Sequence, residues 1–352
     1  MLSDHNLGIP EGDYRDLDLP SYSMLASIAK EGVDVVNGVK GSNFVLKFGS
    51  LVDDMCFMPH VVDDKYHRGR ATKTPTANVK KVLDAVADKL TSTRTKNPFV
   101  KPKPISSSMA KHKDLLLAEC KNQGIYKSYS DENTIKALSK GKTYFKDKLD
   151  SDGKIPISAE MWAHAEATAD TLRTHPFTVR YFDDSASHID IYYQFMFVTD
   201  VRGYKVKGML DCVVADHVNK IIYPVDLKTG EPSVHNFPDV MLQYKYYVQA
   251  ALYRKALINI VNSDPDLRGY KVANFEFVYI SKVNPYKPMV FVVPKELYEK
   301  ALTGFTDVHG YSHKGVHTLL DEYYGCKVHG YCNYTYDESI ESGRVILNNV
   351  YQ

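Results

Sequence analysis

The chain has 352 residues, of which 44% are hydrophobic and 12% aromatic, so it is long enough for one large domain or two modest ones with a sizeable core. Its formal net charge of +1 excludes a polycation, and no apolar run approaches the roughly 18 residues of a membrane-spanning helix. The first residues lack the basic and apolar regions of a secretory signal, so we expect a cytoplasmic protein that does not bind membranes.

The first part of the chain has the residue spacing of short amphipathic helices. Ser21 is a suitable cap for a helix that begins at Tyr22, because a serine oxygen accepts a hydrogen bond from the backbone of the first turn. Apolar residues at helical spacing predict a second helix over 44–58, which Pro59 ends. The same spacing predicts further helices over residues 79–90, 112–123, 131–148 and 157–174.

Residues 65–115 carry a strong local excess of positive charge. This segment has 13 lysines and arginines against the three acids Asp84, Asp88 and Asp114, an excess of ten. It would attract an anionic nucleic acid if it folded beside the active cleft. The alternative is a solvated basic insertion or linker, because Thr, Ser and Pro are frequent on both sides of its predicted helix.

From residue 177 onward the pattern changes to strands, with β-branched and aromatic residues in partial alternation. Residues 216–220 predict a hairpin turn, and apolar residues at helical spacing predict one long helix over 239–262 and another over 294–304. The last forty residues have no pattern that we can assign. Strands are expected over residues 177–182, 189–199, 205–215, 221–227, 272–281 and 289–293.

This order of elements predicts an α/β fold with helical additions, because a run of strands between helices, followed by further strands, forms an α/β sandwich. We expect four parts along the chain. They are an N-terminal helical part over 1–64, the basic insertion or linker over 65–115, a core over 116–310 and a C-terminal extension over 311–352.

Two acids and a lysine lie on neighbouring predicted strands. Asp211 ends the sequence Gly-Met-Leu-Asp, and Asp226 and Lys228 belong to Val-Asp-Leu-Lys-Thr-Gly. Side chains alternate along a strand, so Asp226 and Lys228 share one face. Carboxylates are hard ligands for Mg²⁺, and a lysine places a cation near an attacking water, as metal-dependent cleavage of a phosphodiester requires. A structural role for such acids is common, but three buried charges are costly unless a metal completes the set.

The helix after these strands carries Gln249 and Tyr253 four residues apart, so they lie on one helical face. An amide and a phenol both donate hydrogen bonds to phosphate oxygens, and we expect the pair to bind DNA. The alternative is a half-buried helix on which the tyrosine simply packs, and the nearby Tyr246 and Tyr247 make Tyr253 less distinctive.

Together these motifs resemble the PD-(D/E)XK nuclease superfamily, and within it the branch of RecB-type and phage RecE-type (exonuclease VIII-like) exonucleases. The strand with Asp226 and Lys228, ending in Thr-Gly, and the Gln-x-x-x-Tyr helix are typical of that branch. Residues 21–23, 48–53 and 161–176 are similar to parts of the exonuclease VIII group. The resemblance implies a restriction-endonuclease-like core, a mixed β-sheet flanked by helices.

The resemblance also implies a metal cofactor. In that group a histidine follows the Phe-Gly-Ser/Thr-Leu-Val pattern and contributes to the metal site, whereas this chain has Asp53 there. An aspartate suits Mg²⁺ or Mn²⁺ at least as well; the alternative is a surface acid on a helix. We expect Asp211, Asp226, the carbonyl of Leu227 and Asp53 to bind the metal, and Lys228 to orient and help deprotonate the attacking water. A further acid could act through a water, and the sequence does not choose among Glu160, Glu166 and Asp170.

The activity that the resemblance implies is a Mg²⁺-dependent exonuclease that degrades linear duplex DNA from 5′ to 3′ in recombination or DNA processing. It implies as partners a single-strand annealing recombination protein and further copies of the chain in a ring around DNA, in the cytoplasm of a bacterial host if a phage encodes it. Two alternatives stay open: an endonuclease of the same fold, and a DNA-binding module without catalysis. The chain lacks a Gly-x₄-Gly-Lys-Ser/Thr loop, so it is not an ATP-driven helicase.

The five cysteines are widely spread and fit a reduced protein better than a disulfide framework. A related nuclease branch holds an iron–sulfur cluster on four cysteines, and Cys56, Cys326 and Cys332 supply only three thiolates. With His329 a zinc site is conceivable, but Cys-x₅-Cys is not a standard finger spacing. We therefore expect ordinary free cysteines.

Overall fold

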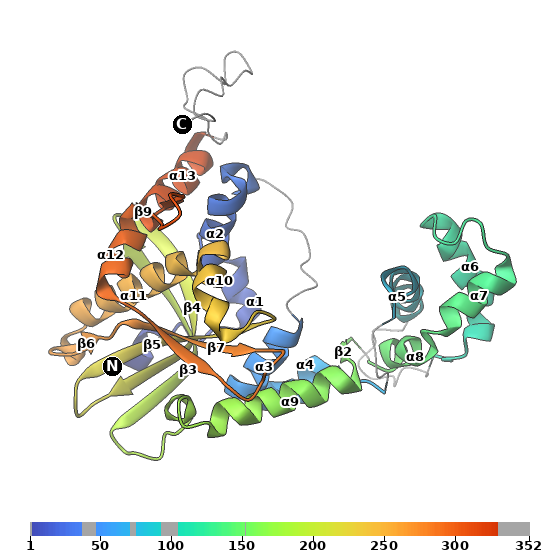
Figure 1. Ribbon diagram of the computed structural model, residues 1–352, viewed down its shortest axis with the longest axis horizontal. Helices are drawn as coiled ribbons and strands as arrows, with labels where there is room; N and C mark the ends of the chain where they lie inside the picture. The colour runs from blue at the N-terminus through green and yellow to red at the C-terminus, as the bar shows by residue number, and fades with distance from the viewer. Residues whose placement is uncertain (1, 37–46, 71–74, 93–104, 152, 330–352) are drawn as a thin grey trace, which may run out of the picture. The chain divides into compact units, whose positions relative to one another are not determined.

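The computed structural model describes residues 2–36, 47–70, 75–92, 105–151 and 153–329 (Figure 1). The chain divides into two compact units, the first formed by residues 1–49 and 170–352 and the second by residues 50–169. Each unit has a hydrophobic core of its own. Within the described ranges, no helix combines the length and the apolar character that crossing a bilayer requires.

The first unit is built on a mixed β-sheet with the strand order β3-β4-β5-β7-β8. Neighbouring strands are antiparallel except for β5 and β7, which are parallel, and the short β6 also pairs with β5 in parallel. Parallel neighbours need a crossover between them, and α11 supplies it. The strands are β3 (Ile189–Val201), β4 (Tyr204–Asp216), β5 (Ile221–Gly230), β6 (Lys271–Val272), β7 (Phe275–Ser281) and β8 (Met289–Val293).

The core of this unit lies where α11 (Tyr246–Ser263) packs across the sheet. The helix buries Val248, Leu252 and Ala256 against sheet residues that include Phe197 and Phe277. Burial of this apolar surface is the main force that fixes the helix on the sheet. The other elements of the unit are η1 (Leu2–His5), α1 (Glu11–Asp16), α2 (Tyr22–Glu31), η2 (Val33–Val36), η5 (Val179–Tyr181), η6 (Val234–Asn236), α10 (Phe237–Gln243), η7 (Pro265–Leu267), α12 (Lys295–Thr303), β9 (Gly304–Thr306), β10 (Ser312–Lys314) and α13 (Val316–His329).

A buried lysine attaches the N-terminal segment to the sheet. The ammonium of Lys207 on β4 donates to the backbone carbonyls of Tyr14, Arg15 and Leu17 at 3.0, 2.8 and 2.6 Å. Lys207 is only 7% exposed, so these carbonyls supply the polar partners that a buried ammonium needs. The three hydrogen bonds therefore hold the end of α1 against β4.

The second unit is mainly helical and has one small parallel sheet, in which β1 (Tyr66–Arg68) pairs with β2 (Ile155–Ile157). The basic segment contributes a real part of its core, because α5 buries Val82, Leu83 and Val86 completely. Its helices are α3 (Lys47–Phe57, which begins in the first unit), α4 (Pro59–Lys65), α5 (Ala77–Ser92), η4 (Met109–His112), α6 (Lys113–Asn122), α7 (Asp131–Ser139), α8 (Lys142–Asp150) and α9 (Ala159–Thr174, which ends in the first unit).

The predicted strands over 189–199, 205–215 and 221–227 are confirmed as β3, β4 and β5. Asp211 lies on β4, Asp226 and Lys228 lie on β5, and the turn at 216–220 joins these two strands. The predicted strand over 177–182 is wrong. That segment forms the short helix η5, and the hydroxyl of Thr178 donates to the carbonyl of Leu172 at 2.5 Å, which keeps the chain folded back on the end of α9.

Two helices that the sequence predicts as continuous are broken. The helix over 131–148 splits into α7 and α8 at Gly141, where an added Cβ would lie 2.5 Å from a methyl carbon of Leu83, so close packing with α5 requires glycine. The helix over 239–262 splits into α10 and α11 at Lys245, whose backbone is left-handed with φ 61°. Residue spacing predicts helical faces and does not detect such breaks.

Cys56, Cys120 and Cys212 are buried free thiols, as expected. The expectation of a free thiol is wrong for Cys326, which is disulfide-bonded. A disulfide depends on how closely the backbone brings two sulfurs together, which spacing along the sequence does not establish. Cys332 lies outside the described residues.

Candidate active site

Asp211 and Asp226 lie where strands β4 and β5 separate. The paired residues of the two strands end at Cys212 and Val225. One step further, in the same register, Asp211 would stand opposite Asp226. There the carboxylate of Asp211 accepts a hydrogen bond from the backbone N–H of Leu227 at 2.9 Å, in place of a backbone carbonyl. The side chain therefore continues the ladder and fixes its carboxylate beside β5.

A distortion in β3 lies on the other side of Asp211. The pairing of β3 with β4 skips one pair of residues, Gln194 and Asp211, between Tyr193–Cys212 and Phe195–Leu210. Gln194 has φ 48°, a left-handed conformation that residues other than glycine rarely adopt within a strand. Backbone strain of this kind concentrates at functional sites. The pairing of β4 with β3 on one side and with β5 on the other is therefore interrupted at Asp211.

Asp226 is almost fully buried, with 2% of its surface exposed, and both of its oxygens have a specific neighbour. Oδ1 accepts a hydrogen bond of 2.5 Å from Nε2 of Gln249, and Oδ2 forms an ion pair with the ammonium of Lys228. That ammonium also lies 4.7 Å from the ring centroid of Tyr246, a cation–π contact. Strand β5 and the first turn of α11 thus hold the carboxylate from two sides.

Burial and mutual repulsion change the protonation of these groups. Burial, and next to it the negative charge of Asp226, raises the pKa of Asp211 from its ordinary 3.8 to about 8. Burial also raises the pKa of Asp226, although Lys228 and Gln249 oppose it. Burial lowers the pKa of Lys228, but the charge of Asp226 outweighs this and the net shift is upward. Lys228 is therefore protonated. A cation bound between Asp211 and Asp226 would stabilise the charged form of both carboxylates.

The predicted helical pair lies as expected on one face of α11, with different surroundings for each residue. Gln249 is 4% exposed, and its Oε1 has no hydrogen-bond partner within the described ranges. Tyr253 is 5% exposed and packs edge-on against Phe197, with ring centroids 5.5 Å apart. An added Cβ at Gly208 would lie 2.1 Å from Phe197 and 2.8 Å from Tyr253, so both rings depend on that glycine.

The donor set of this site suits a hard divalent cation. Asp211 and Asp226 offer carboxylate oxygens, the carbonyl of Leu227 is a third oxygen of the same strand segment, and the buried Oε1 of Gln249 is a polar atom without a partner in the part of the chain that is described. No group of three or more His, Cys, Asp or Glu side chains with the geometry of a metal site occurs among the described residues. Water would therefore complete the coordination of a bound ion.

Other predicted acids lie on elements that belong wholly or partly to the second unit. Asp53 is on α3, and its role as a metal ligand stays a prediction. Glu160, Glu166 and Asp170 are on α9, where the carboxylate of Glu166 accepts a hydrogen bond of 2.7 Å from the indole of Trp162. The choice among these three acids stays open.

Sequence reasoning missed a buried acid on one of the central strands. Glu276 on β7 pairs with Val225 and therefore lies on the opposite face of the sheet from Asp226, which pairs with Phe277. Its Oε2 accepts hydrogen bonds from Arg180 at 2.7 Å and Tyr181 at 2.8 Å. The alternation along β7 could have revealed an acid among apolar neighbours. Its partners give it a structural role.

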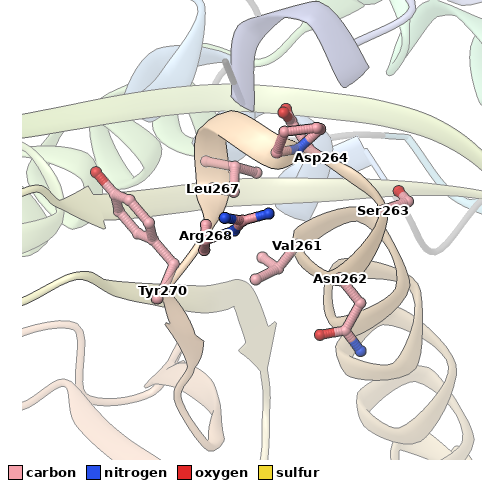
Figure 2. Close-up of a pocket in the computed structure, with 9 residues that line it drawn as sticks. Val261, Asn262, Ser263, Asp264, Leu267, Arg268 and Tyr270 are labelled. Carbon is pink, nitrogen blue, oxygen red and sulfur yellow. The ribbon is translucent and has the colours of Figure 1, made fainter.

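A separate cavity of about 280 Å³ lies at the C-terminal end of α11 (Figure 2). The loop 261–270 forms it, with the side chains of Asp264, Arg268 and Tyr270 around it. Its lining residues do not include Asp211, Asp226 or Lys228, so the cavity contributes nothing to the chemistry of the site that these residues form.

Comparison with known proteins gives a family model that covers most of the chain. Residues 21–313 match a family model described as "PDDEXK-like domain of unknown function (DUF3799)". No curated protein matches. A crystal structure from Eubacterium rectale described as "Putative exonuclease" is similar at 13% identity with a TM-score of 0.32, covering 75% of this chain and 82% of that one. A likeness at that TM-score is too low to carry an argument about fold or activity.

Proposed function

Because the chain belongs to the family of PDDEXK-like domains of unknown function, we propose that it is a Mg²⁺-dependent exodeoxyribonuclease that hydrolyses phosphodiester bonds at the ends of linear duplex DNA. One observation carries this proposal. Asp211 and Asp226 meet where two strands separate, and the ammonium of Lys228 lies against the second acid. Family membership supports nuclease activity, whereas the metal and the preference for DNA ends belong to the proposal.

The residues of the site have distinct proposed roles. Asp211, Asp226 and the carbonyl of Leu227 would hold Mg²⁺ or Mn²⁺, and Asp53 is a further proposed ligand. When bound, the ion would polarise the phosphate and favour hydroxide formation from water. The raised pKa of Lys228 supports a role as a cation that orients the attacking water and stabilises charge on the phosphate.

The helix α11 supports this arrangement through Gln249, which donates to Asp226 and so fixes the orientation of that carboxylate. A polar partner of this kind orients a metal ligand and raises metal affinity. The predicted DNA contacts of Gln249 and Tyr253 stay proposals. The buried ring of Tyr253 favours a packing role in the absence of DNA.

The finer parts of the proposal come from the RecE-type resemblance. They are digestion from 5′ to 3′, a role in recombination beside a single-strand annealing protein, a phage origin with action in the cytoplasm of a bacterial host, and assembly into a homo-oligomer. The local charge excess of residues 65–115 supports a DNA partner, because positive segments attract the phosphate backbone.

Incubation of linear and covalently closed duplex DNA with the protein and Mg²⁺ tests the proposal. We expect loss of the linear DNA only, and no loss with EDTA. Nicking of the closed circles would instead identify an endonuclease, and binding without any cleavage would identify a DNA-binding module. Linear duplexes labelled at the 5′ or the 3′ end then give the polarity.

A further inference from the structure

The turn between α10 and α11 is strained beside the proposed catalytic lysine. Lys245 caps α11 with φ 61° and ψ 32°, a left-handed conformation that usually falls to glycine or asparagine. The hydroxyl of Tyr22 donates to the carbonyl of Tyr244 at 2.8 Å, which holds the turn in place. Because of this left-handed residue, Tyr244 and Lys245 do not continue the helix α11, and their side chains do not follow its helical spacing.

A row of aromatic rings connects this turn with the site. Tyr244 is 44% exposed, and its ring stacks on that of Tyr246 with centroids 5.7 Å apart and planes 20° apart. On Tyr246 lies the ammonium of Lys228, 4.7 Å from the ring centroid. An exposed aromatic ring therefore lies only one ring away from the proposed catalytic cation.

Two lysines at this turn carry positive charge without an anionic partner. The ammonium of Lys30 on α2 lies 4.7 Å from the ring centroid of Tyr244. Among the residues that the structure describes, neither Lys30 nor Lys245 forms an ion pair, although Glu31 and Asp307 act on them from a greater distance. Burial, and then the charge of Lys245, lowers the pKa of Lys30, as expected of two cations that repel each other.

We propose that Tyr244, Lys30 and Lys245 form a nucleotide-binding subsite of the DNA-cleavage site, which we call the turn subsite. The two ammonium groups bind a DNA phosphate next to the one that is cleaved, and the exposed ring of Tyr244 stacks on a base of the same strand. This inference rests on the proposed nuclease function, and it adds the residues that hold the strand beside the scissile bond.

The chemistry of the three side chains matches that of a single nucleotide. Aromatic rings stack on every base, because each base has a π face, and lysines bind phosphates as point charges. The ammonium of Lys30 contacts the face of the Tyr244 ring in a weak, exposed cation–π interaction. A nucleotide can replace that contact at both ends, with its base on the ring and its phosphate on the ammonium.

Binding in Ca²⁺, which supports DNA binding without relying on cleavage, tests the turn subsite separately from catalysis. The probes are short duplexes with 2-aminopurine at the first or second nucleotide of the 5′ or the 3′ end. Stacking on an aromatic ring quenches the fluorescence of this base. We expect quenching with the wild-type protein and with Y244F and Y244W, and a loss of quenching with about tenfold weaker binding for Y244A.

The lysines are tested through the salt dependence of the same binding. We expect Lys30→Gln and Lys245→Gln each to reduce the slope of log K against log salt by about one unit, as removal of one bound phosphate does. Lys300→Gln on α12 removes an exposed lysine that lies outside the turn subsite and should leave the slope unchanged. Equal effects of all three substitutions would mean that the turn subsite contributes only general charge and would overturn the proposal.

A double-mutant cycle shows whether Tyr244 meets a base. An abasic nucleotide at the quenched position should weaken wild-type binding, and it should have no further effect on Y244A. Additive effects would overturn the stacking role, and an unquenched probe at every position would overturn the turn subsite as a whole. Melting temperatures of all variants exclude unfolding as the cause. If the wild-type protein binds as described and never cleaves with Mg²⁺, the nuclease proposal fails while the subsite remains.

Discussion

A hydrogen bond of 2.5 Å from Nε2 of Gln249 to Oδ1 of Asp226 joins the first turn of α11 to strand β5. The bond gives the glutamine a structural role that needs no contact with DNA, because it fixes Oδ1 of a carboxylate whose Oδ2 is ion-paired with Lys228. In the Gln-x-x-x-Tyr pattern, the first residue therefore supports the carboxylate of Asp226, which we propose as a metal ligand.

Replacing Gln249 by leucine keeps the volume and removes the donor. We expect the Mg²⁺ concentration for half-maximal cleavage to rise by about 10–100-fold, as loss of a partner to a metal ligand does. Cleavage rates measured over a series of Mg²⁺ concentrations test this. Gln249→Glu is the matched comparison, because it adds a charge beside Asp226. An unchanged Mg²⁺ dependence in the leucine variant would separate the glutamine from the metal.

Removing the ammonium of Lys228 should stop cleavage and leave DNA binding intact. We expect Lys228→Ala to reduce kcat by at least about 100-fold, because the cation acts on charge that develops during the reaction. Binding to linear duplex in Ca²⁺ should change by less than about threefold. A variant that cleaves as fast as the wild type would remove the lysine from the mechanism.

We expect the metal-free protein to become less stable as the pH rises, because Asp211 and Asp226 are buried close together. The folded pKa of Asp211 is raised to about 8, so the folded state holds a proton that the unfolded chain releases near 3.8. The stability that this proton provides is full below about pH 4 and is lost as the pH rises toward 8. Asp211→Asn cannot lose this proton, and in EDTA it should melt at least roughly 2 °C above the wild type at pH 8.

Melting curves in EDTA and in Mg²⁺ between pH 5 and 8.5 measure this effect. With Mg²⁺ the order should reverse, because the wild type gains a ligand that the asparagine variant binds weakly. If the two proteins show the same pH dependence in EDTA, Asp211 is ionised in the fold and the repulsion between the acids is small.

We expect removal of the Lys207 ammonium to lower the stability of the fold strongly, because it donates hydrogen bonds to three backbone carbonyls. Lys207→Met keeps most of the apolar chain and leaves the carbonyls of Tyr14, Arg15 and Leu17 without their donor. We expect the free energy of unfolding to fall by about 2–4 kcal/mol, since hydrogen bonds to charged groups contribute about 1.5–3 kcal/mol and unsatisfied buried groups add to the loss. Urea denaturation tests this, with Lys205→Met, an exposed neighbour on β4, as control. Equal losses in both variants would contradict it.

Within the basic segment, only some of the positive side chains are available for DNA. Lys89 forms an ion pair with Glu119, whereas the exposed Lys81, Lys111 and Lys113 form none among the described residues. Replacing these three by glutamine should reduce the salt-dependence slope of DNA binding by about one unit for each phosphate that the variant no longer binds. Lys89→Gln should have a smaller effect. An unchanged slope in the triple variant would place this surface away from DNA.

The sequence predicted the strands of the site well, because β4 and β5 combine β-branched residues with a clear turn between them. It also predicted that Asp226 and Lys228 share a face, since alternation along a strand is a geometric rule. What it could not predict were features that depend on tertiary packing. The left-handed Lys245 has no signal of its own, since a lysine ordinarily favours the helix that the spacing indicates.

Exposure was equally hard to predict within the site. Tyr244, Tyr246 and Tyr253 differ little as letters in a sequence, yet one is 44% exposed, one lies against Lys228 and one is 5% exposed beneath Phe197. Which tyrosine faces solvent depends on where the helix breaks. Tyr244, five positions before Gln249, is thus a second tyrosine that we propose for contact with DNA, and the contact of Tyr253 stays a prediction.

The crowding at Gly208 also has an evolutionary consequence. Two rings occupy the space in which any other amino acid would place its first side-chain carbon, so a substitution there would push β4 away from α11 and displace Asp211 three residues later. Homologues that acquire a larger residue at this position should therefore carry a smaller one in place of Phe197 or Tyr253. Divergence at these three positions should be correlated, even where the surrounding strands have drifted apart.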